Sequence, residues 1–193
     1  QKGTIKVYIH ESVPEEDRLI IANFLSEIKE LIRNESIQFE IINELEGYNI
    51  GIVKGGPLLF NELFKNDRSF PPSYLGAATY TRNNQDCAQI EKAELWYTEG
   101  ETLLKHEILH TLGFFHADYA DKNGSIMYHN ITDMEPDMTE NDKNVLRLLY
   151  YNGVYGSIVD TVADCDEDAM YMDKVESEAF KLLLKSIIDN DYL

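Results

Sequence analysis

Three of the five histidines of this 193-residue chain fall in one eleven-residue window, His106-Glu-Ile-Leu-His110-Thr-Leu-Gly113-Phe-Phe-His116. Residues four apart on an α-helix lie on one face, so His106 and His110 can direct their imidazoles toward one point. Gly113 follows three residues after His110, where a left-handed residue can end a helix sharply. The window therefore predicts a helix, a glycine bend, and a loop that brings His116 back toward the first two histidines.

The three imidazoles of this window have the composition of a metal site. Three neutral protein ligands with an open fourth position are typical of catalytic rather than structural zinc. Glu107 lies about 100° around the helix axis from His106, which places it beside a metal-held water and not among the ligands. It is therefore the candidate general base. The alternatives are a chance HExxH on a surface helix and a zinc site without activity. A chance match is disfavoured because Gly113 and His116 extend the pattern in register.

The rest of the chain predicts a mixed sheet packed on helices. Helices are expected to open at Pro14, at Thr102 as a cap, and at Thr139 as a cap followed by Glu140 and Asp142 in the first turn. Residues 61–74 read as an exposed loop, and a polar stretch around Cys87 separates the last two strands. Alternating or apolar runs predict strands over residues 2–10, 37–42, 48–53, 75–81 and 93–97.

The histidine window and a second motif together resemble a known family. The spacing HExxHxxGxxH is the signature of the metzincins, and Ser125-Ile-Met127-Tyr128 resembles their Met-turn, in which a methionine packs beneath the three imidazoles. The resemblance implies an α+β fold, with a mixed twisted β-sheet, an active-site helix, and a mostly helical C-terminal lobe below the zinc cleft. It also implies one catalytic Zn²⁺ held by His106, His110 and His116.

Among metzincins the chain is most similar to the matrixins, the matrix-metalloproteinase-like group. The stretch from Met138 to Tyr150 resembles their final helix. Three positions depart from the pattern. Ala117 stands where matrixins usually carry Ser, Asn141 replaces the first Asp of the final helix, and His129 stands two residues after Met127, so the extra Tyr ligand of astacins and serralysins is missing.

The resemblance implies a domain organisation. Residues 1–152 are expected to form the catalytic domain, with an upper lobe over 1–113 and a lower lobe over 114–152. Residues 153–193 are expected to be an acidic segment plus a helix packed on the same domain. The run from Asp164 to Asp168 lacks the EF-hand pattern and reads as a solvated loop. An alternative is that it docks at the zinc and offers Cys165 or an Asp as a latency switch.

Substrate binding is expected at an edge strand. Matrixin-like enzymes pair an extended peptide with such a strand, and here residues 76–81 are the candidate, with Gly76, Ala77 and Ala78 as tentative contacts. An ordinary sheet strand is an equally good interpretation of this stretch. The wall of the pocket for the residue after the scissile bond should begin at Tyr128 and run to about residue 136.

Charge and composition limit the partners. The formal net charge of −18 repels phosphate backbones, so nucleic-acid binding is not expected. Bound Ca²⁺ is conceivable at Asp118, Asp121 and Asn123, although a turn at Asn123 is the simpler interpretation. No apolar run reaches the length of a membrane span. Cys87 and Cys165 can pair only in an oxidising compartment. The family resemblance implies a monomer that is secreted, periplasmic or at the cell surface.

The leading hypothesis is a zinc-dependent endopeptidase that acts on proteins or peptides. A second enzyme hypothesis uses the same site for a zinc amidase or a narrow-specificity peptidase on small peptides or cell-wall fragments. A third is an inactive binding module with the metzincin fold. The presence of Glu107 argues against the third, because a degenerate copy has no need of the base.

Overall fold

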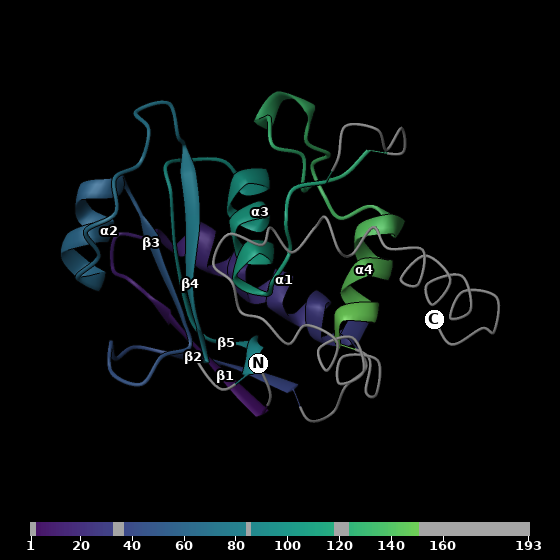
Figure 1. The fold of residues 1–193 in the computed structure, drawn as a ribbon, viewed down its shortest axis with the longest axis horizontal. Coiled ribbons are helices and arrows are strands. Elements are labelled where there is room, and N and C mark those ends of the chain that lie inside the picture. The colour runs from purple at the N-terminus through teal and green to yellow at the C-terminus, as the bar shows by residue number, and fades with distance from the viewer. Residues whose placement is uncertain (1–2, 33–36, 84–85, 118–123, 151–193) are drawn as a thin grey trace.

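The computed structural model describes residues 3–32, 37–83, 86–117 and 124–150 (Figure 1). The predicted α+β class is confirmed there, since a mixed sheet is packed on helices. Residues 153–193, including the expected acidic segment and helix, lie outside the described part, as do Cys165 and the candidate latency switch. The elements in chain order are β1 (Gly3–Ile9), α1 (Glu15–Ile32), β2 (Ile37–Ile42), β3 (Ile50–Lys54), α2 (Pro57–Phe64), β4 (Gly76–Asn83), β5 (Asp86–Tyr97), α3 (Glu101–Thr111), a short 3₁₀ helix (Ile131–Asp133) and α4 (Glu140–Tyr150).

The sheet has five described strands in the order β2-β1-β3-β5-β4. The pairs β1–β2, β1–β3 and β3–β5 are parallel, whereas β4 runs antiparallel to β5 and forms one edge of the sheet. In the β4–β5 register Gly76 pairs with Tyr97. The edge strand therefore begins beside the end of β5, and β5 leads directly into α3.

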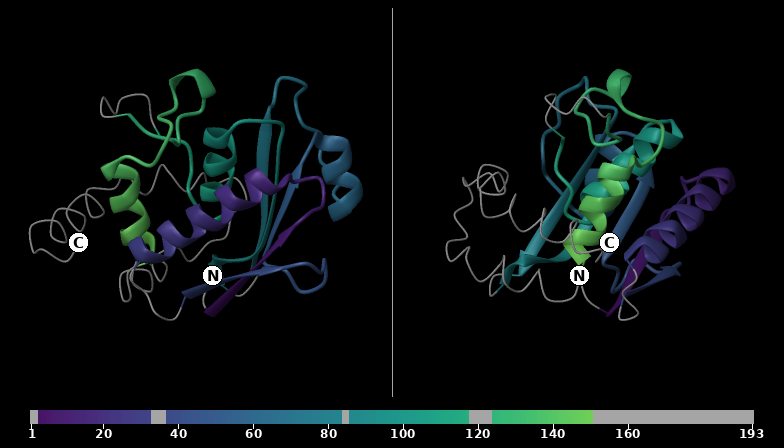
Figure 2. Two further views of the ribbon diagram at one scale, coloured as in Figure 1. Left: turned by 180° about the vertical axis from the view of Figure 1, so that it is seen from behind. Right: turned by 90° about the vertical axis from the view of Figure 1, so that its right-hand side faces the viewer.

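Helices cover both faces of the sheet, as Figure 1 and the left view of Figure 2 show. On one face the apolar stripes of α1 and α3 pack on Ile52, Leu95 and Tyr97. On the other face α2 packs through Phe60 on Val53 and Trp96. Neighbouring strand residues thus point to opposite sides, as the two-residue period of a strand requires. Helix α3 therefore packs on β4 and β5 and lies beside α1 on the same face of the sheet.

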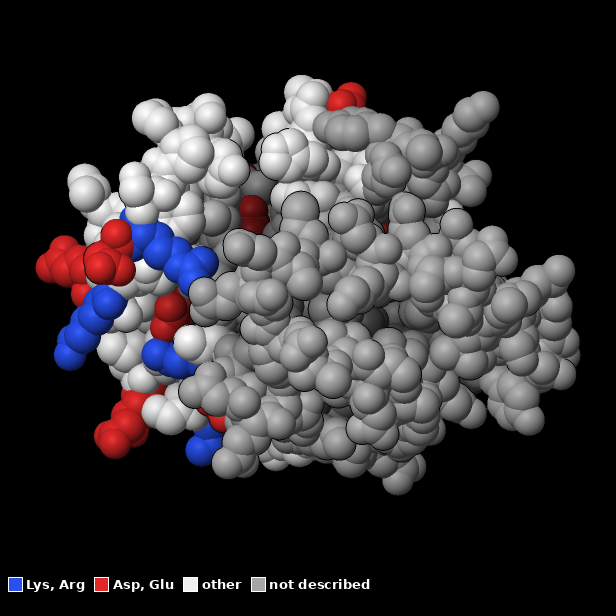
Figure 3. Space-filling view, viewed as in Figure 1, with Lys and Arg blue, Asp and Glu red and all other residues white. Residues whose placement is uncertain are grey.

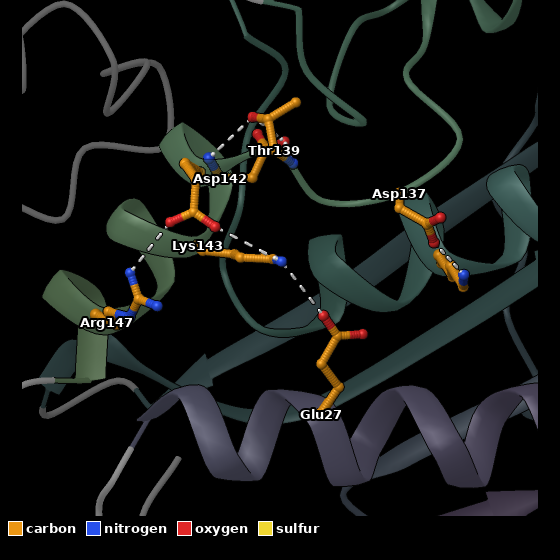
Figure 4. A network of polar contacts seen from close by, with 8 residues as sticks. Glu27, Asp137, Thr139, Asp142, Lys143 and Arg147 are labelled. Carbon is orange, nitrogen blue, oxygen red and sulfur yellow. Dashed lines mark hydrogen bonds and ion pairs between the residues drawn. The ribbon is translucent and has the colours of Figure 1, made fainter.

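Helix α4 closes the same side of the molecule as α1 and α3. Leu146 is fully buried in the main apolar cluster, and the Tyr150 hydroxyl donates to the carbonyl of Leu112 at 3.0 Å. Lys143 reaches from α4 toward Glu27 on α1, with 3.8 Å between nitrogen and oxygen (Figure 4). That contact is partly exposed and adds little stability, so apolar packing and the Tyr150 bond anchor the helix.

Three local expectations are corrected. Residues 61–64 belong to α2 and not to a loop, because Pro57 takes the first helical position, where its missing N–H costs nothing. Helix α3 begins at Glu101 with Gly100 as its N-cap and no side-chain capping bond, so Thr102 is not the cap. The polar stretch around Cys87 belongs to β5, which starts at Asp86 and pairs with β4 in a hairpin.

The charge on the described surface is mixed. In the view of Figure 3, Lys and Arg side chains lie beside Asp and Glu side chains on the left of the molecule. Ion pairs such as Lys105 with Glu101, at 2.6 Å, interleave the two signs elsewhere. In the described ranges, no helix combines the length and apolar composition needed to cross a bilayer.

Candidate metal centre

The end of α3 shows why the sequence bends where it does. Gly113 has φ +96°, so the predicted left-handed residue is present. The Gly113 N–H donates to the His110 carbonyl at 3.0 Å, and the Phe114 N–H donates to the Leu109 carbonyl at 3.2 Å. This pair of bonds is a Schellman motif, which a glycine terminates without strain. The bend buries Phe114 and turns the chain back toward His110.

The bend brings the three histidines of the window together. The Nε2 atom of His110 lies 2.9 Å from Nε2 of His106 and 3.2 Å from Nε2 of His116. One nitrogen from each ring lies within 4.8 Å of the other two. A tetrahedral zinc site with Zn–N bonds of about 2.0–2.1 Å has ligand–ligand edges of about 3.3–3.4 Å. The two Nε2 distances from His110 therefore suit one such ion to within a few tenths of an ångström.

The outer nitrogens decide where the protons are. His106 Nδ1 lies 2.8 Å from the Ile126 carbonyl oxygen, and His110 Nδ1 lies 2.7 Å from that of Phe114. A carbonyl only accepts, so each Nδ1 carries the proton and donates it. Each neutral ring then has a bare lone pair on Nε2, and these lone pairs face one another. Because no proton lies between the two Nε2 atoms, a bound cation is what satisfies both lone pairs. Imidazole nitrogen is a common zinc ligand.

Burial keeps the three rings in the neutral form that a metal requires. Burial, followed by the neighbouring His106, lowers the pKa of His110 to about 3. His116 is more exposed, but partial desolvation and then the neighbouring His106 lower its pKa to about 4, and burial lowers the pKa of His106. Protonation would place positive charges within 3–4 Å of each other, a repulsive arrangement. Near neutral pH the site is therefore a set of free electron-pair donors.

Glu107 lies on the side of α3 that faces the edge strand. Its residue is only 4% exposed, and within the described structure its Oε2 atom has no hydrogen-bond partner. Burial raises the pKa of the carboxyl group to about 8. A Cβ atom at Gly76 would lie 2.8 Å from Glu107 Oε1, so the bare backbone at the start of β4 makes room for the carboxylate. A buried carboxylate oxygen without a donor is expected where a water and a cation complete a site.

The loop that contains Met127 is tied to both ends of the histidine window. Its residue Ile126 supplies the carbonyl that accepts from His106. The Ala117 N–H, one residue after His116, donates to the Met127 carbonyl at 2.8 Å. Met127 itself is buried in the main apolar cluster. The loop therefore helps to place the first and third histidines, while the bend at Gly113 places the second.

Asp142 on α4 anchors the loop at residues 125–126 through hydrogen bonds. Its carboxylate accepts from the Ser125 hydroxyl at 2.5 Å and from the Ile126 N–H at 3.3 Å. The other contacts run to Thr139, whose N–H and hydroxyl donate to Asp142 at 2.9 and 2.8 Å, while the Asp142 N–H reaches the Thr139 hydroxyl at 3.3 Å (Figure 4). This is a capping box with Asp at the third helical position. It confirms Thr139 as the N-cap and links α4 to His106 through Ile126.

The candidate substrate residues Ala77 and Ala78 have their side chains packed in the protein interior. Ala77 packs on the Trp96 cluster and Ala78 on the opposite cluster, so both side chains point into the protein. Any contact of theirs with a bound peptide would run through the backbone. Tyr128 is 8% exposed and stands between Met127 and His129. Asp118, Asp121 and Asn123, the candidate calcium ligands, lie outside the described residues.

Two contributors escaped the sequence analysis. Asp142 was expected as a first-turn acid of the final helix, although two of its four acceptor contacts hold the loop at residues 125–126 and the other two run to Thr139. His129 stands at the position where the resemblance places the Tyr ligand of other metzincins, but its contact with a ligand was not expected: its Nδ1 lies 3.3 Å from Nδ1 of His116. The first could have been found from the Thr139–Asp142 spacing of a capping box. The place of the second, two residues after Met127, was a local signal that this side chain lies near the metal centre, whereas its pairing with His116 depends on how two loops pair.

Comparisons with known proteins concern the fold. No protein-family model matches the chain, and no curated protein is similar to it in sequence. Ninety-four chains of known structure match its fold. Among them is high choriolytic enzyme 1, a hatching enzyme zinc-protease from the medaka fish Oryzias latipes, with a TM-score of 0.45 and 13% identity over 76% of this chain and 88% of that chain. The α+β architecture and the three-histidine centre at the end of α3 agree with what the metzincin resemblance implies.

Proposed function

We propose that the chain is a zinc-dependent metzincin-type peptidase that cleaves within peptide chains. One observation carries the proposal: the Nε2 lone pairs of three histidines converge, while the Nδ1 protons of His106 and His110 are donated to backbone carbonyls. A site arranged in this way, with one position left for water or substrate, is typical of catalytic zinc. The metal ligands are His106, His110 and His116.

Zinc, when bound, supplies a Lewis acid that polarises the scissile carbonyl and makes water a stronger nucleophile near neutral pH. Glu107 is the general base. Its carboxylate takes a proton from the attacking water and then passes it to the leaving amine. Burial raises its pKa to about 8, and a cation nearby moves such a value back toward neutrality. A base with a pKa near the working pH is the most effective kind.

The position of β4 supports binding of an extended peptide. It is an edge strand of the described sheet, and its first residue, Gly76, adjoins the Glu107 carboxylate. A peptide that paired with the free side of β4 would carry its backbone past the general base. Ala77 and Ala78 would then contribute N–H and carbonyl groups and not side chains. We assign the wall of the neighbouring pocket to the stretch that begins at Tyr128.

The test combines metal content with hydrolysis. Purified protein is expected to bind one zinc per chain and to cleave an unfolded protein such as casein, with loss of activity in a chelator and recovery on zinc addition. Replacing Glu107 by Gln keeps the shape of the buried side chain but removes the base. The Glu107→Gln protein should hold one zinc and lose at least about 100-fold in kcat, the contribution of a positioned base.

Each alternative outcome has a distinct meaning. Zinc-loaded Glu107→Gln protein that cleaves as fast as the unsubstituted chain would contradict the role of Glu107. Cleavage of short peptides or cell-wall fragments without any cleavage of casein would identify a narrow peptidase or amidase. Zinc binding with no hydrolysis of either substrate class would identify a binding module.

A further inference from the structure

The third histidine of the metal centre differs from the other two in what holds its outer nitrogen. His106 and His110 each place Nδ1 against a backbone carbonyl. His116 instead places Nδ1 3.3 Å from Nδ1 of His129, and the two rings meet at 88° with their centres 4.6 Å apart. The Nδ1 partner of the third ligand is therefore a side chain, whereas the Nδ1 partners of the first two are backbone carbonyls.

The proton on this contact can be assigned. His116 directs Nε2 at Nε2 of His110, 3.2 Å away, so the metal-facing nitrogen carries the lone pair. The neutral ring then has its proton on Nδ1, which makes His116 the donor. His129 Nδ1 is the acceptor, and the proton of its own neutral ring is on Nε2. A distance of 3.3 Å is at the long end for such a bond.

The chain path explains why this ligand needs a side-chain partner. His106 and His110 are built on one helix, and the bonds at Gly113 fix the second of them. His116 lies beyond the bend in an exposed segment, where no helix sets its ring. The bond from the Ala117 N–H to the Met127 carbonyl pairs that segment with the loop after Met127. This pairing brings His129, also exposed, alongside the ring of His116.

We propose that His129 is a positioning residue for the metal centre: it accepts the Nδ1–H of His116 and so keeps the third imidazole turned with Nε2 toward the ion. The inference rests on the proposed zinc site. Partners of this kind fix the tautomer and orientation of a ligand, and their loss typically costs about 10–100-fold in metal affinity. Because the third ligand has the least support from the backbone, we expect a loss within that range.

The experiment measures the zinc dissociation constant of the full chain by competition with a chromophoric chelator. His129→Phe keeps an aromatic ring but removes the acceptor. His129→Asn restores an acceptor oxygen two bonds from Cβ, at the position of Nδ1. His10→Phe is the matched control, since His10 is another histidine whose ring contacts Ser12, at 3.0 Å, and not the metal centre. Urea unfolding of each protein in chelator measures stability without metal.

We expect zinc affinity to fall about 10–100-fold in His129→Phe, to recover at least partly in His129→Asn, and to stay unchanged in His10→Phe. The stability measured in chelator should be the same in the unsubstituted chain, His129→Phe and His129→Asn. An unchanged zinc affinity in His129→Phe would overturn the inference. A fall in zinc affinity that His129→Asn does not reverse would overturn it too, as would a fall that is accompanied by an equal fall in the stability of the metal-free protein. Failure of the unsubstituted chain to bind zinc would instead refute the proposed function and this inference with it. Zinc binding without peptide hydrolysis would refute the peptidase proposal alone.

Discussion

Replacing Asp142 by Ala tests how far the metal centre depends on α4. The carboxylate is buried, at 6% exposure, and accepts from the Ser125 hydroxyl, the Ile126 N–H, the Thr139 N–H and the Thr139 hydroxyl. Alanine removes all four acceptor contacts at once. It leaves two backbone N–H groups without their partner and removes half of the capping box.

The magnitude follows from those contacts. A buried donor left without a partner costs about 1–3 kcal/mol, and loss of a helix cap costs about 1 kcal/mol. Two N–H groups and one cap together give about 3–7 kcal/mol of lost unfolding free energy, and we expect the lower half of this range because water reaches Thr139, which is only partly buried. Asp142→Asn is the matched control, because its amide oxygen can serve the Ile126 and Thr139 donors while its NH₂ group faces Ser125. We expect it to lose only about 1–2 kcal/mol, the part due to charge.

Urea unfolding followed by tryptophan fluorescence is the assay. Trp96 is the one tryptophan of the chain and is fully buried, so its emission reports loss of the core. The measurement is made in chelator and again in excess zinc. Ile126 connects Asp142 to His106, so Asp142→Ala should also weaken zinc binding, by roughly tenfold. Excess zinc should then raise the unfolding free energy of Asp142→Ala by about 1.4 kcal/mol less than it raises that of the unsubstituted protein.

Two results would refute this reasoning. An Asp142→Ala protein within about 1 kcal/mol of the unsubstituted chain would show that the four contacts carry little net energy. Equal losses for Asp142→Ala and Asp142→Asn would show that charge, and not the loss of acceptors, accounts for the effect.

Two further predictions concern Glu107 and its surroundings. Gly76→Ala places a Cβ 2.8 Å from Glu107 Oε1 and should lower kcat at least about tenfold, with zinc content unchanged. In the control Gly56→Ala the added Cβ meets nothing within 4 Å, so this variant should behave as the unsubstituted chain. Equal kcat values for the two variants would contradict the packing argument. In the metal-free protein, the lowered pKa values of His110 and His116 stabilise the fold fully above their unfolded value of 6.5, and this stability is lost as pH falls through about 4 and 3. The raised pKa of Glu107 acts in the opposite direction, because its stabilising effect is full below 4.5 and is lost as pH rises through about 8. Unfolding free energy measured in chelator should therefore peak near pH 6.5, and Glu107→Gln should flatten the alkaline side; an unchanged alkaline slope would contradict the assigned pKa.

The backbone of the histidine window and most of the described strands and helices were predictable from the sequence. The pattern from His106 to His116 predicts both the helix and the bend, because an i, i+4 pair followed by glycine restricts the backbone to few conformations. The structure shows that helix and φ +96° at Gly113. Thr139 was likewise predictable as a cap, since capping is a local interaction.

Other elements depended on contacts that local sequence does not show. The stretch that begins at residue 61 was predicted as a loop, yet α2 runs from Pro57 to Phe64 because Phe60 is buried against Val53 and Trp96. The polar start of β5 is a strand because it pairs with β4. In both cases tertiary contacts override local propensity.

Long-range contacts also account for what the sequence analysis missed at the site. The approach of Gly76 to Glu107 joins residues 31 positions apart and requires the β4 edge to lie against α3. The contact of His129 with His116 requires the Ala117–Met127 backbone bond. Neither pairing has a periodic signal in the sequence.

X-ray absorption at the zinc edge of the loaded protein tests the central claim most directly. Three imidazoles on one ion should give about three nitrogen neighbours at about 2.0–2.1 Å, with the outer-ring scattering of histidine and one further light atom. Substituting His116 should reduce the imidazole count by one. A spectrum dominated by carboxylate oxygen, or one that the His116 substitution leaves unchanged, would contradict a zinc site built from His106, His110 and His116.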